Sequence, residues 1–135
     1  MHKHLAIFSK DAIKQIFSGK KSWESRFSQK KIAPFATVSV GDIVFIKPPG
    51  EDILGQFRVK KVIYFEGLDD KDWEVIKAYF TNSLSFGTKR KDKDYFTSKK
   101  SAKFGTLLAI DRVEQFITSP VKIPKKDLRG WVVLD

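Results

Sequence analysis

Cysteine is absent from the 135-residue chain, which excludes disulfides, thiolate metal sites and cysteine nucleophiles. No apolar run approaches the roughly 18 residues that a membrane helix needs, and the N-terminal Met-His-Lys-His-Leu-Ala-Ile-Phe lacks the long apolar segment of a signal peptide. The glycine-rich phosphate loops Gly-x-x-x-x-Gly-Lys and Gly-x-Gly-x-x-Gly do not occur either. We therefore expect a cytoplasmic protein that spans no membrane and carries no cofactor.

Positive charge, in contrast, is abundant. The chain has 26 Lys and Arg against 16 Asp and Glu, a net charge of +10 and a pI near 9.8. A basic surface attracts polyanions, so we expect RNA or a nucleotide as partner, with plain solubility as the alternative. Apolar residues, including 12 Phe, make up 41% of the chain, which is enough to form one hydrophobic core. The length predicts a single domain over residues 1–135, and we favour a monomer.

Hydrophobic periodicity predicts an α+β domain. Ser9 is the expected N-cap of a helix over residues 10–18, and Gly19 its C-terminal cap. After Lys60-Lys61 the strand alternation slips by one residue, as at a β-bulge. The pattern predicts strands over 5–8, 37–40, 43–47, 54–65, 107–116 and 131–134, and a second helix over 68–80. Bent strands with two or three helices inserted between them or packed on them suggest a small β-barrel.

The residues just after the first predicted helix carry the chemistry. They form the pattern Gly-x-Lys-x-x-Glu-x-Arg, with Gly19, Lys21, Glu24 and Arg26. Glu24 and Arg26 are two apart and so share one face of a strand. A lysine can hold a phosphate, an arginine can grip a phosphate or a base edge, and a carboxylate can accept from a base amine. The alternative is an intramolecular ion pair that fastens the strand, and both can hold.

This pattern, followed by Gly41-Asp42, resembles the ASCH family of the PUA-like superfamily over most of the chain. The resemblance implies a β-barrel with a cleft beside the motif and a role in RNA binding. Some relatives are amidohydrolases that deacetylate N4-acetylcytidine with Lys, Thr and Glu. Lys21 matches their lysine, but Glu24 replaces the threonine, which argues against that reaction.

Catalysis therefore stays open. Lys21 and Glu24 remain the candidate catalytic residues, and Glu66 and Glu74 are candidates for a third. The alternative to a binding domain is a small hydrolase acting on a modified nucleoside or on RNA. A protein-interaction module with an incidental basic surface is a further alternative.

A second basic region, residues 89–103, mixes cations with aromatics and could be an RNA-backbone rail, a lid over the cleft, or only a solvated loop and helix. Arg58 and Lys60 share a strand face that could border the cleft or face solvent. The candidate binding residues are Lys20, Lys21, Ser22, Glu24, Arg26, Arg58, Lys89, Arg90 and Tyr95.

Four further positions have ordinary structural interpretations. We expect Trp23 to pack in the barrel core, with base stacking as the alternative, and we expect Trp131 in the core. His2 and His4 lack a third ligand nearby, so we expect a frayed terminus and no metal site.

Overall fold

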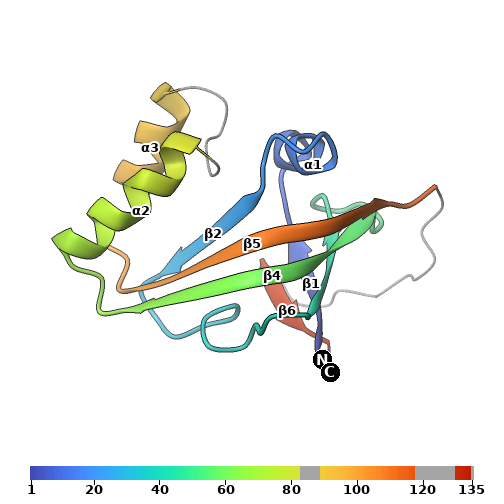
Figure 1. The fold of residues 1–135 in the computed structure, drawn as a ribbon, viewed down its shortest axis with the longest axis horizontal. Coiled ribbons are helices and arrows are strands. Elements are labelled where there is room, and N and C mark those ends of the chain that lie inside the picture. The colour runs from blue at the N-terminus through green and yellow to red at the C-terminus, as the bar shows by residue number, and fades with distance from the viewer. Residues whose placement is uncertain (83–88, 118–129, 135) are drawn as a thin grey trace.

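The computed structural model describes residues 1–82, 89–117 and 130–134, with the side chains of 80–82, 89–92 and 96 left out. Figure 1 shows the chain as a curled sheet with helices over one side. None of the described helices is both long and apolar enough to cross a membrane. The elements are β1 (Lys3–Ile7), α1 (Lys10–Phe17), β2 (Trp23–Ser28), β3 (Ile43–Lys47), β4 (Gly55–Glu66), α2 (Asp70–Asn82), α3 (Lys89–Lys99), β5 (Phe104–Gln115) and β6 (Trp131–Val133).

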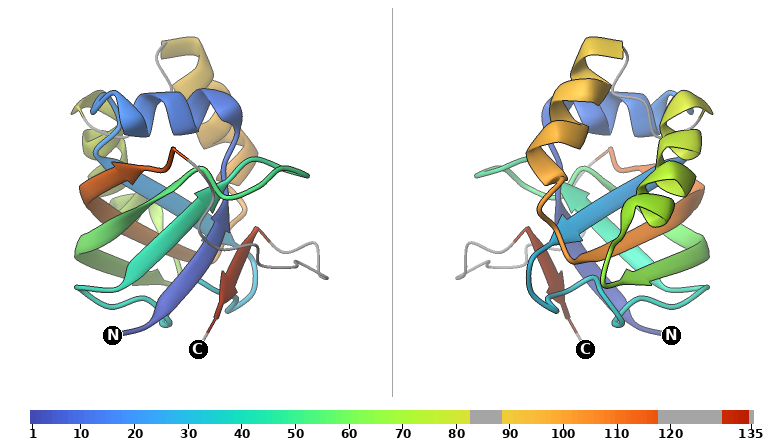
Figure 2. Two further views of the ribbon diagram at one scale, coloured as in Figure 1. Left: turned by 90° about the vertical axis from the view of Figure 1, so that its right-hand side faces the viewer. Right: turned by 90° about the vertical axis from the view of Figure 1, so that its left-hand side faces the viewer.

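Six strands form one mixed sheet in the order β2-β5-β4-β3-β1-β6. β1 and β3 are parallel, and the other neighbouring pairs are antiparallel. The long strands β4 and β5 curl the sheet into a partial barrel, which the side views in Figure 2 make clear. The expected α+β fold on a small PUA-like barrel is therefore confirmed.

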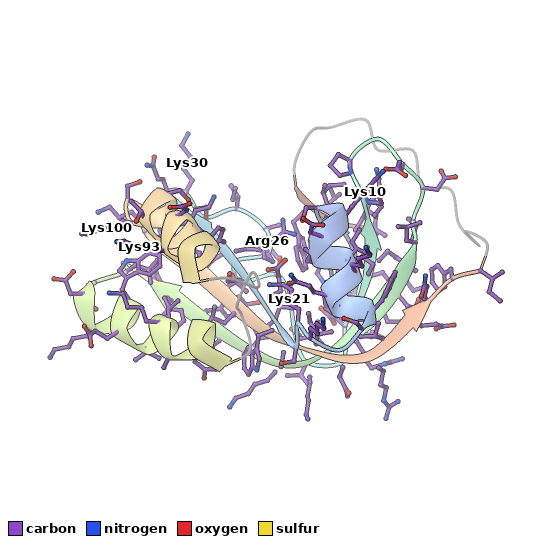
Figure 3. The ribbon with its side chains drawn as sticks, turned by 90° about the horizontal axis from the view of Figure 1, so that it is seen from above. Lys10, Lys21, Arg26, Lys30, Lys93 and Lys100 are labelled. Carbon is purple, nitrogen blue, oxygen red and sulfur yellow. The ribbon has the colours of Figure 1, made fainter. Side chains whose placement is uncertain are left out.

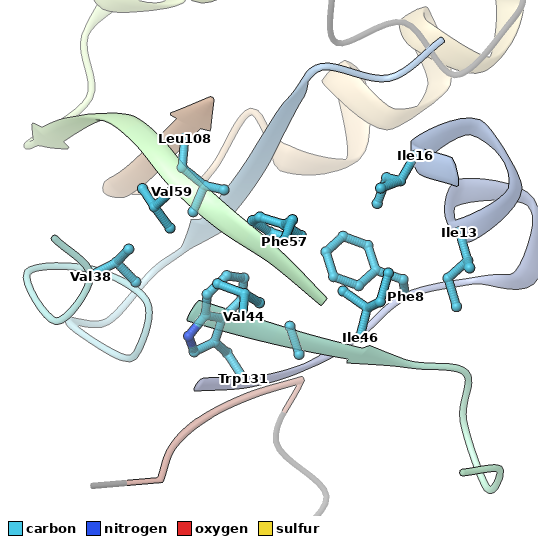
Figure 4. Close-up of a cluster of buried hydrophobic side chains, with 11 residues drawn as sticks. Phe8, Ile13, Ile16, Val38, Val44, Ile46, Phe57, Val59, Leu108 and Trp131 are labelled. Atoms are coloured by element: carbon cyan, nitrogen blue, oxygen red, sulfur yellow. The ribbon is translucent and has the colours of Figure 1, made fainter. Parts of the chain in front are cut away.

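The main core fills the hollow of this curl beneath α1. Ile13 and Ile16 lie on the buried face of the helix, as their spacing predicts, and Ser9 caps the helix by accepting from the Ala12 amide at 3.1 Å. Burying one such aliphatic side chain contributes about 1.5–3 kcal/mol to the stability of the fold. The side chains labelled in Figure 4 are Phe8, Ile13, Ile16, Val38, Val44, Ile46, Phe57, Val59, Leu108 and Trp131.

A smaller cluster lies under α2 and contains Phe27, Trp73 and Ile76. Trp23 packs on its edge, with its ring centroid 4.8 Å from that of Tyr79. Trp23 is only half-buried, so it is a packing residue that keeps part of its ring accessible.

The predicted strand 37–40 is wrong. Residues 33–37 form a turn that contains the cis peptide between Ala33 and Pro34. Both edges of β3 are already occupied by β1 and β4, so this segment cannot pair with the strand that follows it. Its backbone is held instead by side chains: Tyr64 bonds the Val38 backbone, and the Asp42 carboxylate accepts from the Ser39 amide at 2.9 Å.

The expectation of a frayed N-terminus is also wrong at His4, which is fully buried. Trp131 Nε1 donates to His4 Nδ1 at 3.1 Å, so the proton of the neutral imidazole is on Nε2, which donates to Asp42 Oδ2 at 2.9 Å. Burial by itself raises the pKa of Asp42, but hydrogen bonds from the His2 backbone, His4 and the Ser39 backbone lower it below its usual value. This network ties β6 and the Gly41-Asp42 turn to β1, and it places Trp131 in the core as predicted.

Candidate functional site

A cavity of about 350 Å³ opens beside β2, and we call it the motif cavity. It lies between the start of α1, the 32–35 loop, α3 and the segment Gly130–Trp131. Figure 3 shows Lys21 and Arg26 in the space between α1 and α3. Lys10 lies on α1, and Lys30, Lys93 and Lys100 lie at the far side of α3; none of these four lysines lines the cavity.

The motif residues form an ion-paired row in this cavity. Lys21 is 2% exposed and its Nζ lies 3.8 Å from Glu24 Oε1. Arg26 Nη2 lies 3.4 Å from Glu24 Oε2, and Glu24 Oε1 also accepts from the Ser25 amide at 2.7 Å. The strand alternation of β2 places Glu24 and Arg26 on one face, as predicted. One carboxylate between two cations leaves the row with one net positive charge.

Gly19 explains how Lys21 reaches the cavity. Its φ of 78° is a left-handed conformation that glycine adopts without steric cost, and it ends α1 sharply. The Lys21 amide then donates back to the Gln15 carbonyl at 3.0 Å. The turn therefore fixes the backbone of Lys21 between α1 and β2.

Arg26 has a structural role as well. Its Nη2 donates to the Ile7 carbonyl at 2.7 Å, and its Nη1 to the Gly130 carbonyl at 3.4 Å. The guanidinium carbon lies 4.9 Å from the Phe8 ring centre and 5.4 Å from that of Trp131. The fastening ion pair considered from the sequence is thus present, and Arg26 joins β2 to the chain segments around β1 and β6.

Thr106 is a cavity residue that the sequence did not reveal. It lies directly opposite Arg26 in the register of β5 against β2. The residue is 1% exposed, and its hydroxyl has no hydrogen-bond partner among the residues that the structure describes. Buried hydroxyls are nearly always hydrogen-bonded, so one in a cavity wall is available to a water molecule or a ligand group. Only the pairing of strands some 80 residues apart in the chain brings Thr106 to the motif.

α3 supplies the opposite wall through Tyr95 and Lys99. The Tyr95 hydroxyl lies 3.5 Å from Ser25 Oγ, and its ring packs 6.2 Å from that of Phe27. Burial raises the pKa of Tyr95 to about 12, while the Ser25 hydrogen bond lowers it and the Glu24 charge raises it. Tyr95 therefore stays protonated at neutral pH, and its hydroxyl donates to the Ser25 carbonyl at 3.4 Å. Part of the 89–103 region thus lies beside the motif.

The other candidates lie elsewhere. Lys20 and Ser22 are exposed outside this cavity, and Arg58 donates to the Gly41 carbonyl at 3.3 Å. Lys60 does not border the cavity, because it follows the core residue Val59 and lies on the opposite face of β4. The side chains of Lys89 and Arg90 lie outside the described residues.

Neither candidate for the third catalytic residue reaches the cavity. Glu66 is exposed and pairs with Lys31 at 2.8 Å, and Glu74 is exposed on α2. Within the described residues, no group of three or more His, Asp or Glu could hold a metal ion.

Comparison with solved structures finds the same fold elsewhere. The ASCH protein from Zymomonas mobilis superposes with a TM-score of 0.65 at 13% identity, covering 99% of this chain and 88% of that one. A point variant of it gives a TM-score of 0.68, with 99% and 89% covered at 13% identity. The hypothetical protein PH0355 gives 0.57 at 19% identity, covering 82% of this chain and 98% of that one. No family model and no curated protein matches the sequence. The chain therefore has the fold of ASCH proteins of known structure, the fold that the motif implied.

Proposed function

We propose that this domain binds single-stranded RNA or a nucleotide in the motif cavity. The observation that carries the proposal is the unsatisfied Thr106 hydroxyl beside a buried row with one net positive charge. A phosphodiester carries one negative charge and oxygen acceptors, so it matches both features. The cavity volume of about 350 Å³ is within the range of small-molecule sites.

The lining also offers groups that can recognise a base. Glu24 can accept from an exocyclic amine, and the Tyr95 hydroxyl oxygen can accept from a base N–H. Lys99 at the cavity wall can contact a neighbouring phosphate. Arg26 holds the wall in shape by donating from its two terminal nitrogens to the Gly130 and Ile7 carbonyls, and its side chain also lines the cavity.

A matched pair of lysines at the end of α3 provides the test. Lys99 lines the motif cavity, whereas Lys100 is exposed and does not. Fluorescence anisotropy with a labelled single-stranded RNA should show several-fold weaker binding for Lys99→Ala and little change for Lys100→Ala. Equal losses of RNA affinity in the two variants would mean that RNA is attracted by the overall positive charge and not bound at a localised site, and the proposal would be abandoned.

A hydrolase is the second candidate, because Thr106 places a hydroxyl in the cavity that also holds Lys21 and Glu24. The threonine missing from the motif therefore has a counterpart on the neighbouring strand. Purified protein would be incubated with N4-acetylcytidine and with labelled RNA, beside Thr106→Val and Lys21→Met. Turnover that both substitutions abolish would favour the hydrolase, and no turnover in any preparation would leave binding as the function.

A further inference from the structure

A second hollow lies on the other side of β2, and we call it the bulge hollow. Its volume is also about 350 Å³. Trp23 lines it, while the next residue, Glu24, lines the motif cavity. Likewise, Lys21 lines the motif cavity and Ser22 lines the bulge hollow. Residues 21–24 therefore separate the two hollows. The lining residues are Ser22, Trp23, Lys60, Lys61, Ala109 and Ile110.

The β-bulge in β4 creates the positive side of this hollow. Val59 pairs with Ile110 and Lys61 with Ala109, so Lys60 is the extra residue. In a regular strand two consecutive lysines would point to opposite faces. The bulge instead leaves both Lys60 and Lys61 exposed and lining one hollow. No acidic residue is among the described side chains that line it.

Trp23 supplies the other side. Trp23, Ala109 and Lys61 follow one another in register across β2, β5 and β4. Tyr79 of α2 holds the indole at a 4.8 Å centroid distance and a 54° angle, while the ring stays half-exposed. A supported, accessible aromatic beside two cations is the arrangement with which proteins bind single-stranded nucleic acid.

We propose that the bulge hollow binds a second stretch of the strand whose neighbouring nucleotide occupies the motif cavity. Lys60 and Lys61 contact backbone phosphates, and Trp23 stacks on a base. β2 is an edge strand of the sheet, so a bound chain can pass over it without breaking a strand pair. This inference rests on the proposed function and extends it to a ligand of several nucleotides.

The test compares a mononucleotide with a single strand of about 12 nucleotides, a length that single-strand-binding folds cover. The double variant Lys60→Ala, Lys61→Ala should leave mononucleotide binding unchanged and weaken oligonucleotide binding. The slope of log affinity against log salt should also fall by about 1.4, since each phosphate contact on a single strand contributes about 0.7. Lys14→Ala with Lys71→Ala removes two exposed charges that line neither hollow and serves as the control.

Trp23 provides an independent readout. Base stacking should quench its fluorescence when the oligonucleotide binds, and Trp23→Phe should remove the quenching beyond what the mononucleotide causes through Trp131 in the wall of the motif cavity. Trp23→Leu keeps bulk against Tyr79 and should weaken oligonucleotide binding roughly tenfold.

The outcomes are distinct. The bulge-hollow proposal would be overturned if the double variant lost no more oligonucleotide affinity than the control. It would also be overturned if neither the salt slope nor the Trp23 fluorescence changed with the oligonucleotide. In both cases mononucleotide binding would persist. A protein that binds neither probe would overturn the motif cavity as well.

Discussion

Replacing Thr106 by valine should stabilise the fold and weaken ligand binding at the same time. Valine has nearly the shape of threonine and suits a strand, but it removes the buried hydroxyl that has no partner. A side chain that only supports the fold would show the opposite pattern, with lower stability and unchanged binding. The direction of the change in stability, taken with the direction of the change in binding, therefore distinguishes a ligand-binding hydroxyl from a structural one.

The magnitudes follow from the burial of Thr106, which is 1% exposed. A buried hydroxyl without a hydrogen bond costs about 1–3 kcal/mol, so the free energy of unfolding should rise by about 1 kcal/mol or more. In a domain of this size that raises Tm by roughly 3 °C per kcal/mol. A hydrogen bond to a charged ligand group contributes about 1.5–3 kcal/mol, so its loss should weaken binding about ten- to a hundredfold.

Thermal unfolding by circular dichroism and anisotropy titration with single-stranded RNA measure the two effects. Thr106→Ser keeps the hydroxyl and should retain binding, while the lost methyl group lowers stability by about 0.8 kcal/mol. Thr37→Val changes an exposed threonine and should alter neither quantity. If Thr106→Val unfolds at a lower temperature and binds RNA as the wild type does, the assignment of Thr106 to the ligand is refuted.

Two further predictions concern stability. Gly55→Ala would place a Cβ 2.3 Å from the Glu114 carbonyl oxygen and 2.9 Å from the Phe17 ring, so urea denaturation should show a loss of about 1–3 kcal/mol; an unchanged midpoint would contradict this packing. The pKa of Asp42 is lowered from about 3.8, so its contribution to stability is complete above that pH and is lost as the pH falls through the lower folded value. Asp42→Asn should therefore lower Tm at neutral pH and flatten its decline below about pH 4, as calorimetry would detect.

The local sequence predicted those elements whose signals are local. Ser9 and Gly19 marked the ends of α1 to within a residue, and residues 43–47 form β3 over the predicted range. The slip at Lys60-Lys61 predicted the bulge that the register confirms. Residues 37–40 alternate like a strand, but both sides of the neighbouring strand β3 are paired with β1 and β4, and alternation alone cannot reveal that.

The sequence by itself also determined the motif row, because a strand period of two places Glu24 and Arg26 on one face. Tertiary structure alone decided what surrounds that row. Thr106 reaches it through strand pairing, His4 meets Asp42 and Trp131 across three distant segments, and the bulge brings Lys61 to the same hollow as Lys60. The physical reason is that periodicity fixes which side of its own element a residue occupies, whereas only the pairing and curling of the whole sheet fix which other residues it meets.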